Sequence, residues 1–190
     1  MRTEKDFLGE IRLEDGVYYG SATARAVSNF RASGIPADRE IILAVTEVKK
    51  AAAITNRDAG FLEQKKADAI IAACDEVLGG AFADQFVTDA LQGGAGTSLN
   101  MNVNEVLANR AIELLGGQKG DYSLVHPLDD VNLHQSTNDV FPTALRIAAI
   151  RRLKCVSEGF ADLQTALQEK EKEFSSVLKI GRTEMQDAVP

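Results

Sequence analysis

A glycine-rich segment at residues 93–106 decides the fold prediction: Gly93-Gly94-Ala95-Gly96-Thr97-Ser98-Leu99-Asn100-Met101-Asn102-Val103-Asn104-Glu105-Val106. Its three glycines allow positive φ angles, or a close approach of the backbone to a ligand. Hydroxyl and amide side chains follow, immediately before a helical pattern of apolar residues. Such a loop presents backbone N–H groups at a helix N-terminus, where an anion is favoured. The simpler interpretation is a helix cap after a flexible turn.

The composition indicates a mostly α-helical protein of a reducing, cytoplasmic compartment. The 190 residues, 45% of them apolar, can bury one core and a small second subdomain. A net charge of −7 and the lack of a basic run argue against nucleic acid or an anionic membrane surface as a partner. No stretch approaches the roughly 20 apolar residues of a membrane span, and residues 1–6 lack the apolar core of an export signal. Cys74 and Cys155 lack metal-ligand spacing, so we interpret both as buried free thiols and expect no metal site.

Apolar residues at three-and-four spacing predict helices separated by turn residues. The expected helices cover residues 23–30 after a Ser21 or Thr23 cap, 37–56, 62–78, the stretch from the glycine-rich segment to Gly116, and 141–174. Residues 1–20 are expected to be irregular, residues 118–133 lack a helical period and are expected to form a loop with room for short turns, and residues 82–87 are interpreted as a short extended piece. The sequence therefore predicts a mainly α protein.

The helix expected over residues 141–174 is unusually long. Pro142 suits its first turn, and at 1.5 Å per residue the helix would make a rod of about 50 Å, longer than the diameter of a small domain. Helices of this length normally lie in bundles or coiled coils, and the chain supplies no partner helix to match. We therefore expect partner helices from other chains or from sequence outside these residues, and association through the exposed apolar face.

Two further polar loops accompany the glycine-rich segment: Gln135-Ser136-Thr137-Asn138-Asp139 and Gly181-Arg182-Thr183-Glu184-Met185-Gln186-Asp187-Ala188. Hydroxyl, amide and backbone N–H donors clustered in this way can bind a carboxylate without a cation. They could also stabilise an enolate-like dianion that forms when a proton is removed beside that carboxylate. Three ordinary helix caps would use the same residue types, so the spacing leaves both interpretations open. Because the chain stops directly after the third loop, at Val189-Pro190, we expect it to be truncated.

The three loops, in content and order, resemble the aspartase/fumarase superfamily. The resemblance rests on residues 94–109, on residues 135–139 with Pro142-Thr143, and on residues 181–183 with 186–188; residues 49–53 and 71–78 add to it. It covers all 190 residues and corresponds to the N-terminal part of a family subunit. It implies a mainly α fold, with an N-terminal helical lyase domain over residues 1–139. Residues 140–190 would begin the central helical bundle with its first long helix.

Two positions separate the nearest relatives within the superfamily. Ala95 and Thr137 resemble L-aspartate ammonia-lyases, whereas class II fumarases typically have serine at both places. Against that, residues 126–130 are similar to the second anion site of fumarases, with Leu128 in place of the usual asparagine. His126 is therefore either a binding residue or a structural loop histidine. His134 is interpreted as a surface or packing residue.

The resemblance implies reversible anti-elimination of ammonia from L-aspartate to give fumarate, without a cofactor, in a cytoplasmic homotetramer. Removal of the Cβ proton would leave an aci-carboxylate carbanion, and Thr97, Ser136 and Thr137 would hold the carboxylate that takes up the charge. Asn138, with Thr97, would contact the amino group that leaves, and Thr183 would contribute from a neighbouring subunit. Further candidates for substrate contact are Ser98, Asn102, Glu184 and His126. Glu184 stands where relatives carry His or Gln, so its role is open between recognition of an ammonium group and exposure to solvent.

The catalytic base of the family is a serine in a mobile loop, and no such loop occurs in these residues. We therefore place no catalytic residue before Pro190, and expect the chain alone not to turn over substrate. Three classes of function remain open at this point. The first is part of an ammonia-lyase, with a class II fumarase as the alternative of the same fold. The second is a non-catalytic dicarboxylate-binding module, and the third is a helical scaffold, whose stability dicarboxylates would not affect.

Overall fold

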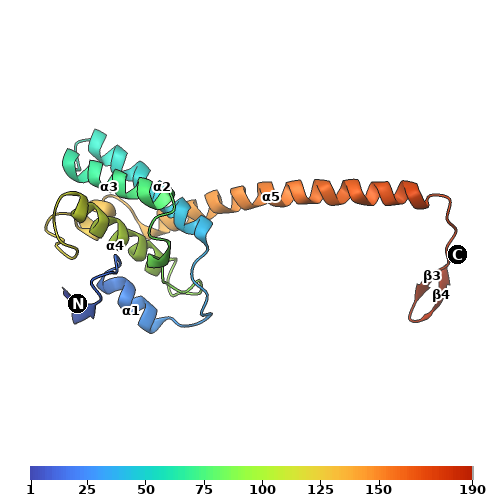
Figure 1. Ribbon diagram of the computed structural model, residues 1–190, viewed down its shortest axis with the longest axis horizontal. Coiled ribbons are helices and arrows are strands. Elements are labelled where there is room, and N and C mark those ends of the chain that lie inside the picture. The colour runs from blue at the N-terminus through green and yellow to red at the C-terminus, as the bar shows by residue number, and fades with distance from the viewer. Residues whose placement is uncertain (190) are drawn as a thin grey trace. The chain divides into compact units, whose positions relative to one another are not determined.

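The computed structural model describes residues 1–189, and helices make up most of it, as predicted (Figure 1). In chain order the elements are β1 (Arg2–Asp6), β2 (Gly9–Leu13), α1 (Ser21–Asn29), α2 (Arg39–Asp58), α3 (Gln64–Leu78), the 3₁₀ turn η1 (Ala83–Gln85), α4 (Thr97–Leu114), the π-helical turn η2 (Pro127–Val131), α5 (Thr137–Phe174), β3 (Gly181–Thr183) and β4 (Gln186–Val189). The chain divides into two compact units, Met1–Ala148 and a second that starts at Ala149. The division falls inside α5, and the domain boundary expected at residue 139 stays a prediction.

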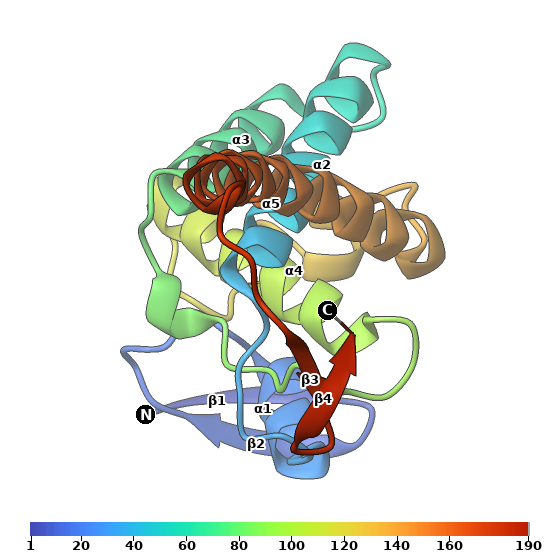
Figure 2. The same ribbon diagram turned by 90° about the vertical axis from the view of Figure 1, so that its right-hand side faces the viewer.

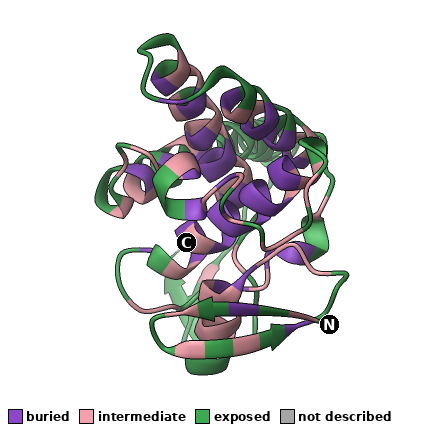
Figure 3. Ribbon diagram, turned by 90° about the vertical axis from the view of Figure 1, so that its left-hand side faces the viewer, coloured by how far each residue is buried: buried purple, intermediate pink, exposed green. Residues whose placement is uncertain are grey.

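The core of the first unit lies among α2, α3 and α4, whose facing sides are buried (Figure 3). Helix α4 packs against α1, α2, α3 and η2, so nearly every side of it is covered. Its apolar residues Val103, Val106, Leu107 and Ile112 are fully buried. The covering also buries polar side chains of the same helix, and each of these must find hydrogen-bond partners inside the protein.

Glu105 of α4 shows how one of these polar residues is used. Its carboxylate accepts hydrogen bonds from the backbone N–H groups of Gly20, Ala22 and Thr23, at 2.8–3.1 Å, and from the Thr23 hydroxyl at 2.6 Å. The N-terminus of α1 is therefore capped by a carboxylate from another helix. The predicted Ser21 or Thr23 cap is wrong, because the N-cap residue is Gly20, which has no side chain to do this. Burial raises the pKa of Glu105, while these hydrogen bonds act to lower it.

Residues 1–20, expected to be irregular, contain an antiparallel hairpin of β1 and β2 beside α1 (Figure 2). The strands pair from Arg2 with Leu13 to Asp6 with Gly9. The Arg25 guanidinium of α1 donates to the Asp6 carboxylate at 2.8 and 2.9 Å, which ties the hairpin to the helix. The expectation failed because β1 is almost entirely polar, and in β2 only Ile11 and Leu13 alternate with charged residues, which is too short a pattern to indicate a strand.

Two other local expectations need correction, and the loop expected over residues 118–133 contains a short turn as the sequence allowed. Residues 82–87 hold the 3₁₀ turn η1 rather than an extended piece, and Phe82 before it has a positive φ of 61°. The short turn within residues 118–133 is η2. Helix α5 begins at Thr137, before Phe141, because the polar loop itself supplies the N-cap; Pro142 therefore lies inside the helix, where it removes one backbone hydrogen bond.

The second unit consists of the remainder of α5 and the hairpin β3–β4. Arg182 pairs with Asp187 across this hairpin, and their side chains form an ion pair at 3.0 Å. Side chains of residues 151–180 are exposed throughout. Cys155 is therefore exposed, contrary to expectation, because this part of α5 has no helix packed on it, whereas Cys74 of α3 is buried as expected. Across residues 1–189, no helix has the length and apolar character needed to cross a membrane.

Candidate functional site

The N-terminal turns of α4 and α5 are in direct contact. Gly96 is the N-cap residue of α4 and has a φ of +81°, which side chains other than glycine rarely adopt. A Cβ atom at this position would overlap the ring of Phe141, which lies near the start of α5. The absence of a side chain at Gly96 therefore lets the glycine-rich loop pack against the Phe141 ring of α5. The glycine-rich loop and the Ser136 loop each precede the positive end of a helix dipole.

At the start of α4, two backbone N–H groups have no hydrogen-bond acceptor within residues 1–189. The Leu99 N–H donates to the Gln92 side chain at 2.7 Å, and the Asn100 N–H donates to the Gly96 carbonyl at 3.0 Å. Gly96 offers no capping side chain, and no group in residues 1–189 accepts from the N–H of Thr97 or Ser98. Free N–H groups in an exposed first turn can bind water or an anion.

At the start of α5 the loop does act as a cap. The Ser136 hydroxyl accepts from the Asn138 N–H at 3.2 Å, and the Ser136 carbonyl accepts from the N–H groups of Asp139 and Val140 at 3.0 Å. Ser136 and Asn138 are exposed and Thr137 is half-buried, so their remaining donors face accessible space. The cap and anion interpretations are compatible here, because a hydroxyl that accepts one bond can still donate another.

Two of the further candidates have structural partners. Asn102 is fully buried; its side-chain oxygen accepts from the Val87 N–H at 3.0 Å and its amide nitrogen donates to the Gln85 carbonyl at 2.9 Å. It therefore holds the chain around η1 and is not part of the contact between the two loops. Nδ1 of His126 accepts from the N–H groups of Leu128 and Asp129, at 3.2 and 3.1 Å, and so caps η2.

His134, interpreted from the sequence as a surface or packing residue, packs edge-on against the ring of Phe61, with the ring centroids 4.8 Å apart. Its Nδ1 lies 3.0 Å from the Asn56 side-chain oxygen. Thr183 and Glu184 belong to the second unit, where Thr183 ends β3 and Glu184 lies at the hairpin turn with a φ of +50°. The other candidates lie in the first unit, with Thr97 and Ser98 in the first turn of α4 and Ser136, Thr137 and Asn138 at the start of α5.

Behind the two loops lies a buried polar cluster that the sequence analysis missed. The side-chain oxygen of Asn132 accepts from Lys49 Nζ at 2.6 Å, and from the amide nitrogens of Asn100 and Asn104 at 3.1 and 3.2 Å. The Asn132 amide nitrogen donates to the Gln135 carbonyl at 2.9 Å. Lys49 is fully buried, and this burial lowers the pKa of its amine to about 7.

A signal for this cluster is present in the sequence. Thr97, Asn100 and Asn104 are spaced three and four apart, which places them on one face of α4. Lys49 occupies a buried position in the apolar pattern of α2. The signal is incomplete, because nothing local indicates that Asn132 is the common partner.

The comparisons with known proteins agree with this architecture. A protein-family model described as lyase matches residues 9–190. The chain belongs to this lyase family. The match to relatives of two kinds, aspartate ammonia-lyases and a class II fumarate hydratase, confirms membership in the aspartase/fumarase superfamily.

Three relatives illustrate the likeness of this lyase chain. The aspartate ammonia-lyase of Bacillus subtilis (strain 168) is 50% identical over 189 residues, covering 100% of this chain and 40% of that protein. The class II fumarate hydratase of Halobacterium salinarum is also 50% identical, over 190 residues, with the same coverage of 100% and 40%. A crystal structure of a fumarate lyase:delta crystallin from Brucella melitensis has a TM-score of 0.93 at 48% identity, covering 100% of this chain and 43% of the other. The lyase chain thus spans about 40% of the length of the curated relatives it matches.

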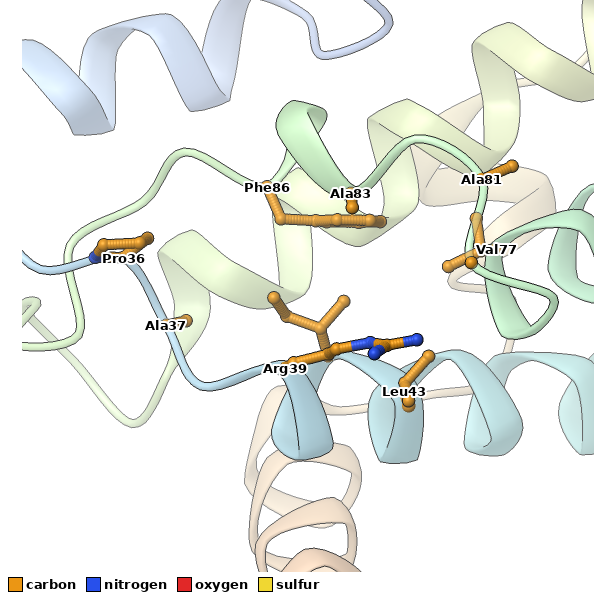
Figure 4. Close-up of a pocket in the computed structure, with 10 residues that line it drawn as sticks. Pro36, Ala37, Arg39, Leu43, Val77, Ala81, Ala83 and Phe86 are labelled. Atoms are coloured by element: carbon orange, nitrogen blue, oxygen red, sulfur yellow. The ribbon is translucent and has the colours of Figure 1, made fainter.

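A separate apolar pocket lies among α2, α3 and η1 of the lyase chain, with a volume of about 140 Å³ (Figure 4). Phe86 and Leu43 line it from opposite sides, with Arg39 at its polar side. None of the predicted site residues lines this pocket. Within residues 1–189, no group of three or more His, Cys, Asp or Glu side chains is placed to hold a metal ion.

Proposed function

We propose that the complete gene product carrying these residues is an L-aspartate ammonia-lyase, and that this chain supplies its dicarboxylate-binding loops. The reaction is the reversible anti-elimination of ammonia from L-aspartate to give fumarate, without a cofactor, in a cytoplasmic homotetramer. The observation that carries the proposal is the contact of Gly96, the N-cap residue of α4, with Phe141 of α5, together with N–H groups of Thr97 and Ser98 that have no acceptor within residues 1–189. Identity of 50% to an aspartate ammonia-lyase over the whole chain supports the choice of substrate.

In this proposal the chain stabilises charge on the substrate. When a base removes the Cβ proton, the electron pair of the C–H bond moves into the adjacent carboxylate, which becomes an aci-carboxylate dianion. Hydroxyl groups of Thr97, Ser136 and Thr137 donate to that carboxylate, and these bonds strengthen as its charge grows. The electron pair then returns from the carboxylate to form the Cα=Cβ double bond of fumarate, the Cα–N bond breaks, and the ammonium nitrogen takes the electron pair of that bond and leaves as ammonia past Asn138 and Thr97.

The remaining groups come from elsewhere in the assembly. The base is a serine outside these residues. Thr183 reaches the site from a neighbouring subunit, together with Glu184, which would recognise an ammonium group or face solvent.

A class II fumarase is the second candidate. It is favoured by the 50% identity to the class II fumarate hydratase of Halobacterium salinarum, which equals the identity to the ammonia-lyase of Bacillus subtilis. The same loops would then bind fumarate while water, not ammonia, is added. Ala95 and Thr137 are the residues that favour the ammonia-lyase.

The experiment follows fumarate by ultraviolet absorbance, with L-aspartate and with L-malate offered separately to the complete gene product. We expect activity with L-aspartate only, and none from the 190-residue chain assayed beside it. Replacement of Thr97 by alanine should lower kcat/KM about 100-fold, as for the loss of one donor to a developing oxyanion. Thr55→Ala, on the exposed side of α2, is the matched control and should leave it unchanged.

Activity with L-malate only would replace the proposal with the fumarase. Activity with neither substrate would contradict both, and would favour a dicarboxylate-binding module without catalysis.

A further inference from the structure

The side chain of Asn132 forms hydrogen bonds both to α4 and to the backbone just before Ser136, so it links the two segments that carry the candidate site. Its oxygen accepts hydrogen bonds from Asn100 and Asn104, which lie on the face of α4 that begins with Thr97. Its amide nitrogen donates to the carbonyl of Gln135, which is peptide-bonded to Ser136. The position of the Ser136 loop relative to α4 is thus set by a residue that touches neither loop's hydroxyl groups.

Lys49 of α2 holds Asn132 in place. Its Nζ atom lies 2.6 Å from the Asn132 oxygen, and its side chain is fully buried. The neighbouring residue Lys50 differs, since it is partly exposed and forms an ion pair with Asp75 at 2.5 Å. A buried amino group is costly, so its use at this position calls for an explanation other than stability.

The amides of the cluster point to the same conclusion. Three donors converge on the single oxygen of Asn132, while no protein group within residues 1–189 donates a hydrogen bond to the buried side-chain oxygens of Asn100 and Asn104. Each unsatisfied buried oxygen destabilises the fold. Apolar residues of similar volume at these places would avoid that cost, so stability alone does not account for the arrangement. Costly polar clusters of this kind are expected beside functional sites.

We propose that Lys49 and Asn132 are positioning residues, which set the separation of the two substrate-binding loops by fastening the Gln135–Ser136 backbone to α4. This inference rests on the proposed function for the identity of the ligand, a dicarboxylate. Neither side chain touches the substrate; both act through Asn100, Asn104 and the Gln135 carbonyl. The positive charge of Lys49 also attracts the bound dicarboxylate dianion, and this attraction is stronger in the poorly hydrated protein interior than in water.

The groups facing the Lys49 amine are few. Within residues 1–189, Cys74 of α3 is the titratable group that interacts with it electrostatically, and burial raises the pKa of that thiol to about 12. The side chains reaching the cluster from α4 and from residue 132 are neutral amides. Within the cluster, Lys49 is therefore the group whose charge changes near neutral pH.

The test compares four variants of the complete gene product: Lys49→Met, Lys49→Gln, Asn132→Asp and the matched surface control Lys50→Met. The first readout is hydrogen exchange of residues 132–140, with α3 as the internal reference. Lys49→Met should raise exchange of 132–140 at least tenfold and leave α3 unchanged. Lys49→Gln keeps a donor and should restore part of the protection. Asn132→Asp keeps the acceptor for Lys49 but loses the donor to Gln135, so exchange should rise.

The second readout is the affinity for succinate between pH 6 and pH 9, measured by calorimetry. Affinity of the wild type and of Lys50→Met should fall as pH rises through about 7, where Lys49 loses its charge. Lys49→Met should bind at least tenfold more weakly at pH 6 and lack that dependence. The two histidines are present in every variant, so their titration cancels in the comparison.

The outcomes separate this inference from the proposed function. Unchanged exchange at 132–140 in both Lys49→Met and Asn132→Asp would overturn the positioning role. Equal succinate affinity and pH dependence in Lys49→Met and the wild type would also overturn it. A wild type that binds no succinate and turns over neither substrate contradicts the proposed function, while the exchange readout still decides whether Lys49 and Asn132 hold the loop. If Lys49→Met does not fold, Lys49→Gln and Asn132→Asp decide the question.

Discussion

Three asparagines of α4 show how the surroundings of a residue, rather than its type, decide its role. Asn100, Asn102 and Asn104 alternate along a single turn and a half of one helix. Asn102 bonds to the backbone on either side of Phe86, whereas Asn100 and Asn104 converge on Asn132. A helix turns by about 100° per residue, so neighbours two apart face different parts of the protein.

Lys49 gives a prediction at the scale of one residue. Burial lowers its pKa to about 7 from the usual lysine value of 10.5, so between these pH values the unfolded chain binds more protons than the folded one. The free energy of unfolding should therefore rise with pH, by about 1.4 kcal/mol per unit from this group. Urea denaturation of the chain at pH 7, 8 and 9 should show this rise relative to Lys49→Met. Lys50→Met should keep the slope of the wild type, and parallel curves for Lys49→Met and the wild type would contradict the assignment.

At the scale of elements, the contact between the N-cap of α4 and Phe141 near the start of α5 depends on Gly96. Alanine at this position would strain a φ of +81° and also overlap the Phe141 ring. Gly116 supplies a matched control, because its φ is +83° and a Cβ there would meet nothing within 4 Å. Both substitutions carry the left-handed backbone cost of about 1–2 kcal/mol, and only Gly96→Ala adds about 1–3 kcal/mol of overpacking.

Chemical denaturation of the two alanine variants should show this difference, with Gly96→Ala the less stable. Combining it with Phe141→Ala removes the ring and should recover the overpacking part, so the two substitutions should be less than additive. Equal losses for Gly96→Ala and Gly116→Ala would show that the glycine-rich loop does not pack against Phe141 as described.

At the scale of the whole molecule, α5 presents an apolar stripe with nothing packed on it. Leu153, Val156, Phe160, Leu163 and Leu167 recur at alternating intervals of three and four residues, and each is at least half exposed. This spacing is that of a coiled-coil seam. An exposed stripe of this kind drives association in water.

We therefore expect the chain to form oligomers in a concentration-dependent way, as seen by light scattering. Leu163→Glu should weaken association about tenfold or more, because a carboxylate in the seam would lose its hydration. Thr165→Glu adds the same charge on the opposite face of α5 and should leave association unchanged. A monodisperse monomer at all concentrations would show that the stripe does not drive association.

The sequence was sufficient for those features that neighbouring residues specify. The extents of α2, α3 and the end of α4 follow from apolar spacing and turn residues, and the structure confirms them within a few residues. The motifs at 94–109 and 135–139 led to the family that the comparisons show. Both kinds of signal are local, since capping, helical period and loop chemistry act over a few positions along the chain.

Only the tertiary structure decided which polar residues work together. Glu105 caps a helix that begins more than 80 residues earlier, and Lys49 and Asn132 are separated by 83 positions. The hairpin of β1 and β2 was missed for the same reason, since the bond from Arg25 to Asp6 that attaches it to α1 joins residues 19 positions apart. Contacts of this kind form because burial forces each polar group to find a partner, and which partner it finds depends on how the helices pack.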